Sequence, residues 1–128
     1  MIGFIMVGTN DLEASSRFYD IILSTIGFSK VLTAERYIGY ADKNKKEEIK
    51  FYITKPFNKE KATYGNGTQI SFLVDTRMLV DEFYNTALKN GAISEGDPRP
   101  RPSNNDTTYY AYFRDLDGNK ICAYCEKI

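Results

Sequence analysis

The sequence predicts an α+β fold in which two βαβββ modules are joined in one chain of 128 residues. One observation is that a strand, helix and strand pattern runs twice along the chain. A second is that Phe18 and Tyr19 return 65 residues later as Phe83 and Tyr84, inside the second helical segment. Duplicated units pair so that neither leaves an apolar face bare. We therefore expect two curved mixed sheets around a shared open groove, with the helices outside, in a single domain of residues 1–128.

The first module spans about residues 1–60. Residues 2–9 are apolar and β-like, and Asn10 or Asp11 can cap the helix that follows. Apolar residues recur at helical spacing over residues 12–26, and Gly27 is a suitable stop. Three short strands are predicted at residues 29–34, 37–41 and 49–54. The mixed charge run of residues 42–50 then becomes a solvated hairpin loop.

The second module spans about residues 66–128 and repeats this order. A strand is predicted at residues 68–76, a helix at 77–92 with Gly91 as its stop, and strands at 108–115 and 120–127. The proline-rich residues 98–107 are predicted to form a loop, because proline cannot join a central strand. Strand alternation places Tyr110 and Tyr112 on one face and Tyr109 on the other.

Charge and composition exclude several classes of function. Lys plus Arg and Asp plus Glu both number 17, so no basic field attracts nucleic acid or an anionic membrane. No apolar run is long enough to span a membrane. The two cysteines form no disulfide framework, which favours a reducing compartment, most simply the cytoplasm. Histidine, the usual general base and metal ligand, is absent.

Four stretches and their order resemble the glyoxalase/bleomycin-resistance/dioxygenase superfamily, also called vicinal oxygen chelate proteins. The stretches are VGTNDLEASSRFYD, GNGTQISFLV, VDEFYNTALKNGA and YYAYFRDLDGNKI, and they extend over nearly the whole chain. The resemblance implies a groove in which metal-bearing members hold a divalent ion with two histidines and a glutamate. The matching positions here are Phe4, Gln69 and Cys122, none of which keeps the family residue.

These three residues form a poor donor set. A catalytic metal needs about three protein ligands. Phe4 donates nothing, the Gln69 amide suits hard cations, and a Cys122 thiolate suits soft ones. We therefore expect no bound metal and no cofactor.

Cys122 is also a weak candidate nucleophile. No histidine can activate it, although Lys50 is placed to lower its pKa if it lies nearby. Cys122 and Cys125 are three residues apart on a strand and should face opposite sides, so they cannot share a metal. A buried, space-filling role is favoured for both.

Three functions fit these observations. The first is metal-independent binding of a small organic molecule in the groove, for which the candidate contacts are Tyr52, Tyr110, Tyr112, Tyr124, Arg99 and Arg101. Loops 55–67 and 98–107 would cover the ligand. The second is a glyoxalase-type lyase, isomerase or dioxygenase, with or without metal. The third is a non-catalytic homodimer whose groove is filled by its own side chains. In each case we expect a homodimer that binds neither nucleic acid nor membrane.

Overall fold

The computed structural model describes residues 1–103 and 107–126, and it confirms the predicted fold class. The first module consists of β1 (Ile5–Gly8), α1 (Leu12–Ser24), β2 (Phe28–Thr33), β3 (Tyr37–Asp42) and β4 (Phe51–Thr54). The second consists of β5 (Ile70–Leu73), α2 (Arg77–Lys89), β6 (Ile93–Pro100), β7 (Tyr109–Arg114) and β8 (Lys120–Cys125). Neither helix is long and apolar enough to cross a membrane, in the part of the chain that the structure describes.

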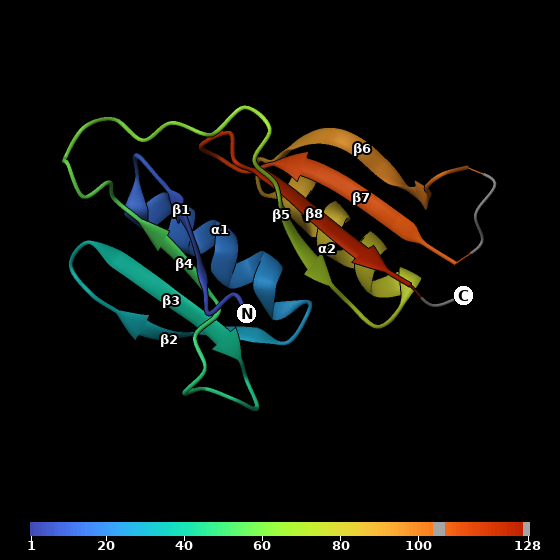
Figure 1. Ribbon diagram of the computed structural model, residues 1–128, viewed down its shortest axis with the longest axis horizontal. Helices are drawn as coiled ribbons and strands as arrows, with labels where there is room; N and C mark the ends of the chain where they lie inside the picture. Colours follow the sequence, from blue (N-terminus) through green and yellow to red (C-terminus); the bar gives the residue numbers. More distant parts are fainter. Residues whose placement is uncertain (104–106, 127–128) are drawn as a thin grey trace.

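Each module forms one mixed sheet of four strands. The strand orders are β1-β4-β3-β2 and β5-β8-β7-β6, so the two modules have the same topology. The first strand of each module pairs in parallel with the last, and the other neighbours are antiparallel. Both helices lie behind the sheets in Figure 1. Each sheet therefore has one face against its helix and one face that the helices leave uncovered, which we call the open face.

The helices begin at side chains that cap them. The Asp11 carboxylate accepts a hydrogen bond from the Ala14 backbone N–H, and the Thr76 hydroxyl accepts one from Leu79 N–H. Each cap satisfies a backbone donor that has no partner within the helix. Gly27 and Gly91, predicted as stops, both have positive φ angles, of 83° and 107°, just after the two helices end.

One hydrophobic core joins the two modules. Phe18 of α1 packs edge-on against Phe113 of β7, with ring centroids 6.3 Å apart. Phe72 of β5 contacts Phe51 of β4 at 5.5 Å and Phe83 of α2 at 5.7 Å. Because the Phe18–Phe113 and Phe72–Phe51 contacts cross between the modules, neither half buries its apolar residues without the other.

The proline-rich segment differs in part from its prediction as a loop. Pro98 and Pro100 belong to β6. This strand lies at the edge of its sheet and pairs irregularly with β7. An edge strand tolerates proline because its outer side needs no backbone donors. Residues 104–106 of the predicted loop lie outside the described residues.

Candidate functional site

The open face of the second module carries a ladder of stacked tyrosines. Tyr110 and Tyr112 of β7 lie with ring centroids 6.1 Å apart and ring planes 8° from parallel. Tyr124 of β8 stacks on Tyr110 at 5.1 Å and 6°. The Tyr109 hydroxyl instead donates to Asp81 of α2, which confirms that it faces the helix. Three nearly parallel rings are therefore stacked on the open face. They belong to β7 and β8, which are neighbouring strands (Figure 1).

Cys122 lies beneath this ladder, on the same face of β8 as Tyr124. Its strand neighbours in register are Ser71 of β5 and Tyr112 of β7. Its side chain is fully buried, and burial raises its pKa to about 11, although a hydrogen bond with Ser71 opposes the shift. Cys125 belongs to the hydrophobic core, which confirms that the two cysteines face opposite sides. At neutral pH, with nothing bound, Cys122 therefore keeps its proton, and a neutral thiol is a poor nucleophile.

Two cations lie next to Cys122, and neither is Lys50. Arg101 and Lys120 both act to lower the pKa of the thiol, less strongly than burial raises it. The Arg101 guanidinium lies 5.1 Å from the centre of the Tyr112 ring, and the Lys120 amino group lies 5.2 Å from it. Lys50 instead lines a small cavity of about 200 Å³ between β4 and β5. Lys50 is therefore not among the groups that shift the pKa of Cys122.

Sequence reasoning missed Lys120 altogether. Residues 120–127 are predicted to form a strand, and side chains alternate along a strand. Lys120 should therefore share a face with Cys122, two residues later, and this alternation was the signal that could have identified it.

Arg99 and Arg101 have different surroundings. Arg99 is exposed and lies 3.8 Å from Asp97 of the same strand, which is a weak surface pair. Arg101 is partly buried and donates a hydrogen bond to the Tyr110 carbonyl. Arg101 therefore contacts the tyrosine ladder, whereas Arg99, although it is the register partner of Tyr110, pairs with Asp97 at the surface.

The three positions implied by the family resemblance are divided between the sheets. The Gln69 amide donates to the Ser71 hydroxyl over 3.0 Å, and Ser71 also bonds Cys122, so these two positions lie together. Phe4 precedes β1 in the first module and packs against Tyr52 of β4, with ring centroids 5.0 Å apart. Tyr52 also contacts Tyr37 at 5.8 Å. The first module thus has its own small aromatic cluster, separate from the tyrosine ladder.

A divalent metal does not fit these residues. Phe4 has no donor atom, so the three positions offer at most the Gln69 amide oxygen, which suits hard cations, and the Cys122 sulfur, which suits soft ones. Within residues 1–103 and 107–126, no three His, Cys, Asp or Glu side chains are grouped so that they could hold a metal. No step through a metal is therefore derived for this site.

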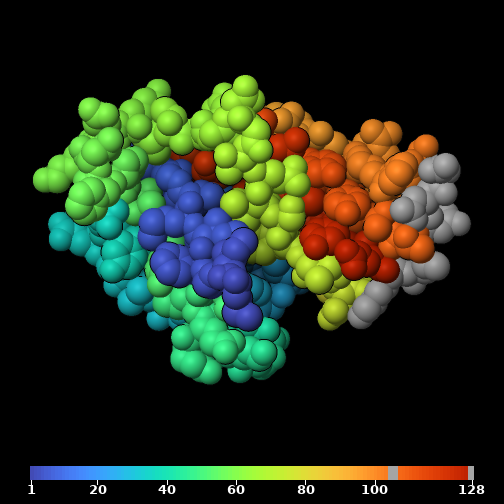
Figure 2. Space-filling model, viewed as in Figure 1, coloured from blue at the N-terminus to red at the C-terminus, as the bar shows by residue number. Residues whose placement is uncertain are grey.

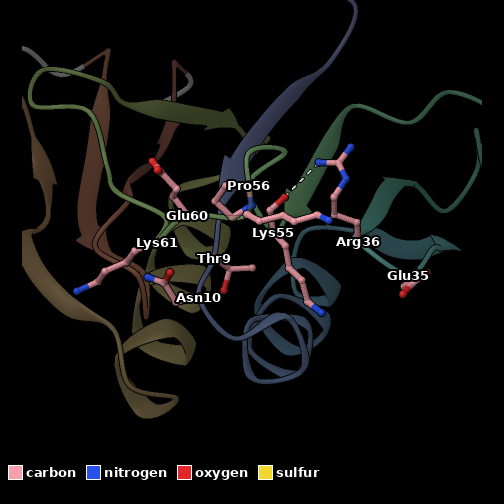
Figure 3. A pocket seen from close by; sticks show the side chains of 9 residues that line it. Thr9, Asn10, Glu35, Arg36, Lys55, Pro56, Glu60 and Lys61 are labelled. Carbon is pink, nitrogen blue, oxygen red and sulfur yellow. Dashed lines mark hydrogen bonds between the residues drawn. The ribbon is translucent and has the colours of Figure 1, made fainter.

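A larger pocket lies elsewhere, at the end of the first sheet. It has a volume of about 650 Å³, and loop residues 55–61 form much of its wall, together with Thr9, Asn10, Glu35 and Arg36. In Figure 3 the side chains of Lys55, Lys61 and Glu35 point in different directions, and Arg36 bonds the Lys55 carbonyl over 3.2 Å. None of the predicted site residues lines it. Divergent, mostly exposed charges provide no common point for a ligand.

The segment that follows this loop crosses between the two modules. In Figure 2 it is lime and lies between the blue N-terminal segment and the red C-terminal strand. Tyr64 holds it in place, because the Arg114 guanidinium lies 5.3 Å from its ring centre. Gly118, with a φ of 88°, permits this approach, since a Cβ there would lie 2.6 Å from the ring. The segment thus borders the open face of the second sheet.

Comparisons with known proteins agree with this geometry. No protein-family model matches the chain, and no curated protein matches it significantly. Among solved structures, FosX, a fosfomycin resistance protein from Mesorhizobium loti, is 19% identical, with a TM-score of 0.69 over 100% of this chain and 93% of that one. A glyoxalase/bleomycin resistance protein/dioxygenase family enzyme from Burkholderia phytofirmans PsJN is 18% identical, with a TM-score of 0.72 over 98% of both chains. Both show the likeness in fold.

A third structure is nearer in sequence. It is a glyoxalase/bleomycin resistance protein from Albidiferax ferrireducens T118, with 36% identity, a TM-score of 0.85 and 96% of each chain covered. That identity over nearly the full length of both chains, with two modules of one topology, shows that this protein belongs to the glyoxalase/bleomycin-resistance/dioxygenase superfamily.

Proposed function

We propose that the protein binds a small organic molecule on the open face of its second module, without a metal. The observation that carries this proposal is the ladder of Tyr110, Tyr112 and Tyr124, whose rings lie within 8° of parallel. Aromatic surfaces with a few placed polar groups are typical of small-molecule sites. Here Gln69 and Arg101 supply polar groups at its borders.

The pKa values of the side chains on this face favour binding over catalysis. Burial raises the pKa of Tyr110, of Tyr112 and of Cys122, in each case away from neutrality. A general acid or base works best with a pKa near the operating pH. The chain has no histidine to fill that role. We therefore infer that the site sequesters its ligand, as a resistance protein would, and leaves it chemically unchanged.

The sheets also favour a homodimer. Phe4, Met6 and Leu73 are 56%, 42% and 62% exposed, and they lie at the β1 and β5 edges of the two sheets. Unpaired edge strands that carry apolar side chains favour pairing with another chain. A second copy would cover these edges, while the tyrosines on β7 and β8 lie further into the sheet.

A thermal-shift screen of organic metabolites and antibiotics, with protein treated with a chelator, tests the proposed function. A ligand that binds only the folded state raises the unfolding temperature by mass action. We expect hits without added metal, and we expect Tyr124→Ala to abolish their shifts. Tyr37→Ala, in the aromatic cluster of the first module, is the matched control and should keep them. Hits that require a divalent metal, or that survive Tyr124→Ala, would contradict the proposal.

A further inference from the structure

The tyrosine ladder has a cationic end. Arg101 and Lys120 both lie over the ring of Tyr112, at 5.1 and 5.2 Å from its centre. Both also act on the thiol of Cys122, so their charges converge on one place in the sheet. Two cations near one ring repel each other, and a negative charge bound near both of them would stabilise the arrangement.

No carboxylate of the described residues neutralises this pair. The ion pairs within residues 1–103 and 107–126 involve Arg17, Lys30, Arg99 and Arg114, the last with Glu95 at 2.7 Å. Cys122, beneath the two cations, is a neutral thiol. A negative charge, Glu126, acts on Tyr110 and thus lies at the opposite end of the ladder. The face therefore has a positive end at Tyr112 and a negative end beyond Tyr110.

The backbone holds Arg101 in this position. Its guanidinium donates to the Tyr110 carbonyl, and its own carbonyl accepts from the Thr108 hydroxyl over 2.7 Å. Gly96 of β6 provides the space, because a Cβ there would lie 2.9 Å from the guanidinium and 3.0 Å from the Tyr112 ring. A side chain held by one hydrogen bond over a glycine, on a backbone held by another, is preorganised for a partner.

From this arrangement we infer that the ligand is a planar organic anion. Its carboxylate or equivalent group lies toward Arg101 and Lys120, and its ring packs against the stacked tyrosines, away from Glu126. This inference rests on the proposed function and assigns its ligand class. Aromatic packing and charge are both required, so neither an uncharged ring nor a small inorganic anion satisfies the site.

Calorimetric titration with three probes tests the ligand class. The probes are 2-naphthoate, its neutral isostere 2-naphthamide, and inorganic phosphate, each added to the chelator-treated protein. We expect 2-naphthoate to bind at least about tenfold more tightly than 2-naphthamide, since a hydrogen bond to a charged group contributes that much. We expect phosphate not to displace it.

Variants test which side chains cause the preference for 2-naphthoate over 2-naphthamide. Arg101→Gln and Lys120→Gln should each weaken 2-naphthoate about tenfold and leave 2-naphthamide unchanged. Arg17→Gln, which removes an exposed arginine on α1, is the matched control and should change neither. Gly96→Ala keeps both cations but displaces the guanidinium, so it should weaken 2-naphthoate even if Arg101→Gln fails to fold. Circular dichroism identifies any variant that does not fold.

The outcomes separate the ligand class from the proposed function. Equal affinity for 2-naphthoate and 2-naphthamide, with both lost in Tyr124→Ala, would overturn the claim that the ligand is an anion. The claim that the tyrosine face binds a ligand would still stand. Displacement of 2-naphthoate by phosphate would overturn the requirement for a planar ring. No binding of 2-naphthoate would overturn the ligand class, while the metabolite screen described above decides the proposed function separately.

Discussion

At the scale of single residues, one buried carboxylate organises the turn between β7 and β8. The Asp115 side chain accepts hydrogen bonds from the backbone N–H groups of Asp117 and Asn119 and from the Asn119 amide. The Tyr19 hydroxyl of α1 adds a fourth donor at 2.6 Å. Burial raises the pKa of Asp115, and these four hydrogen bonds oppose that shift. A fully partnered buried acid fixes the turn against the first module.

Removing the Tyr19 hydroxyl should destabilise the protein. We predict that Tyr19→Phe lowers the free energy of unfolding by about 2 kcal/mol, because its acceptor is a carboxylate. Tyr84→Phe is the matched control, since the Tyr84 hydroxyl donates to the neutral hydroxyl of Ser94 over 2.7 Å. That change should cost about 1 kcal/mol in urea-unfolding experiments. An equal loss in both variants would show that the Asp115 contact has no special strength.

The raised pKa of Cys122 predicts that the protein loses stability at alkaline pH. The folded state holds the thiol proton more tightly than the unfolded state, since the pKa rises from 9.0 to about 11. Its contribution is complete below pH 9 and is lost as pH rises from about 9 to 11. The stability advantage of the wild type over Cys122→Ala should therefore shrink by roughly 2 kcal/mol between pH 8 and pH 11. A difference that stays constant with pH would contradict the raised pKa.

At the scale of elements, the helices and most strands follow from local patterns, because capping residues and alternation act within a few positions. Asp11 as one of two possible caps, Gly27 as a stop, and the strands of residues 108–115 and 120–127 were predicted for this reason. The βαβββ order implies a strand where β6 lies, but not its extent, because its pairing depends on β7 and its two prolines argue for a loop when seen alone. Arg101 was predicted as a ligand contact, but its position over Tyr112 was not predicted. It depends on the path of an irregular segment over Gly96, which no periodicity encodes.

The cap of α2 gives a prediction at this scale. Thr76→Ala removes the hydroxyl that accepts from Leu79 N–H over 3.1 Å. We expect the free energy of unfolding to fall by about 1 kcal/mol, as is typical for a lost cap. Asn85→Ala, at an exposed position inside the same helix, should change stability by less than about 0.5 kcal/mol. Thermal unfolding of the two variants together checks this, and an unchanged Thr76→Ala would mean that the cap is dispensable.

At the scale of the whole molecule, the two stretches that most resemble the superfamily contact each other. The Asn119 amide of the second module donates to the Gly8 carbonyl of the first over 2.9 Å. The Asn10 backbone N–H donates to the Asp117 carboxylate, also over 2.9 Å. The motifs therefore join the modules, and their presence in the sequence indicates the fold without indicating the chemistry. The aromatic core shared by α1, β5 and β7 also joins the two modules.

We predict that the two modules unfold together. Asn119→Ala leaves the Gly8 carbonyl without this donor and should cost roughly 2 kcal/mol. Far-ultraviolet circular dichroism and tyrosine fluorescence should still report a single, coincident transition in the variant, since the core crosses both halves. Two separated transitions would show that the modules are independent and that their shared core contributes little.

The central claim, that a ligand binds the tyrosine face without metal, is tested most directly by nuclear Overhauser effects. The measurement uses chelator-treated protein with a hit from the metabolite screen or with 2-naphthoate. We expect contacts between ligand protons and the ring protons of Tyr110, Tyr112 and Tyr124. Contacts confined to the first module or to the pocket beside loop residues 55–61, or contacts that appear only after a divalent metal is added, would contradict it.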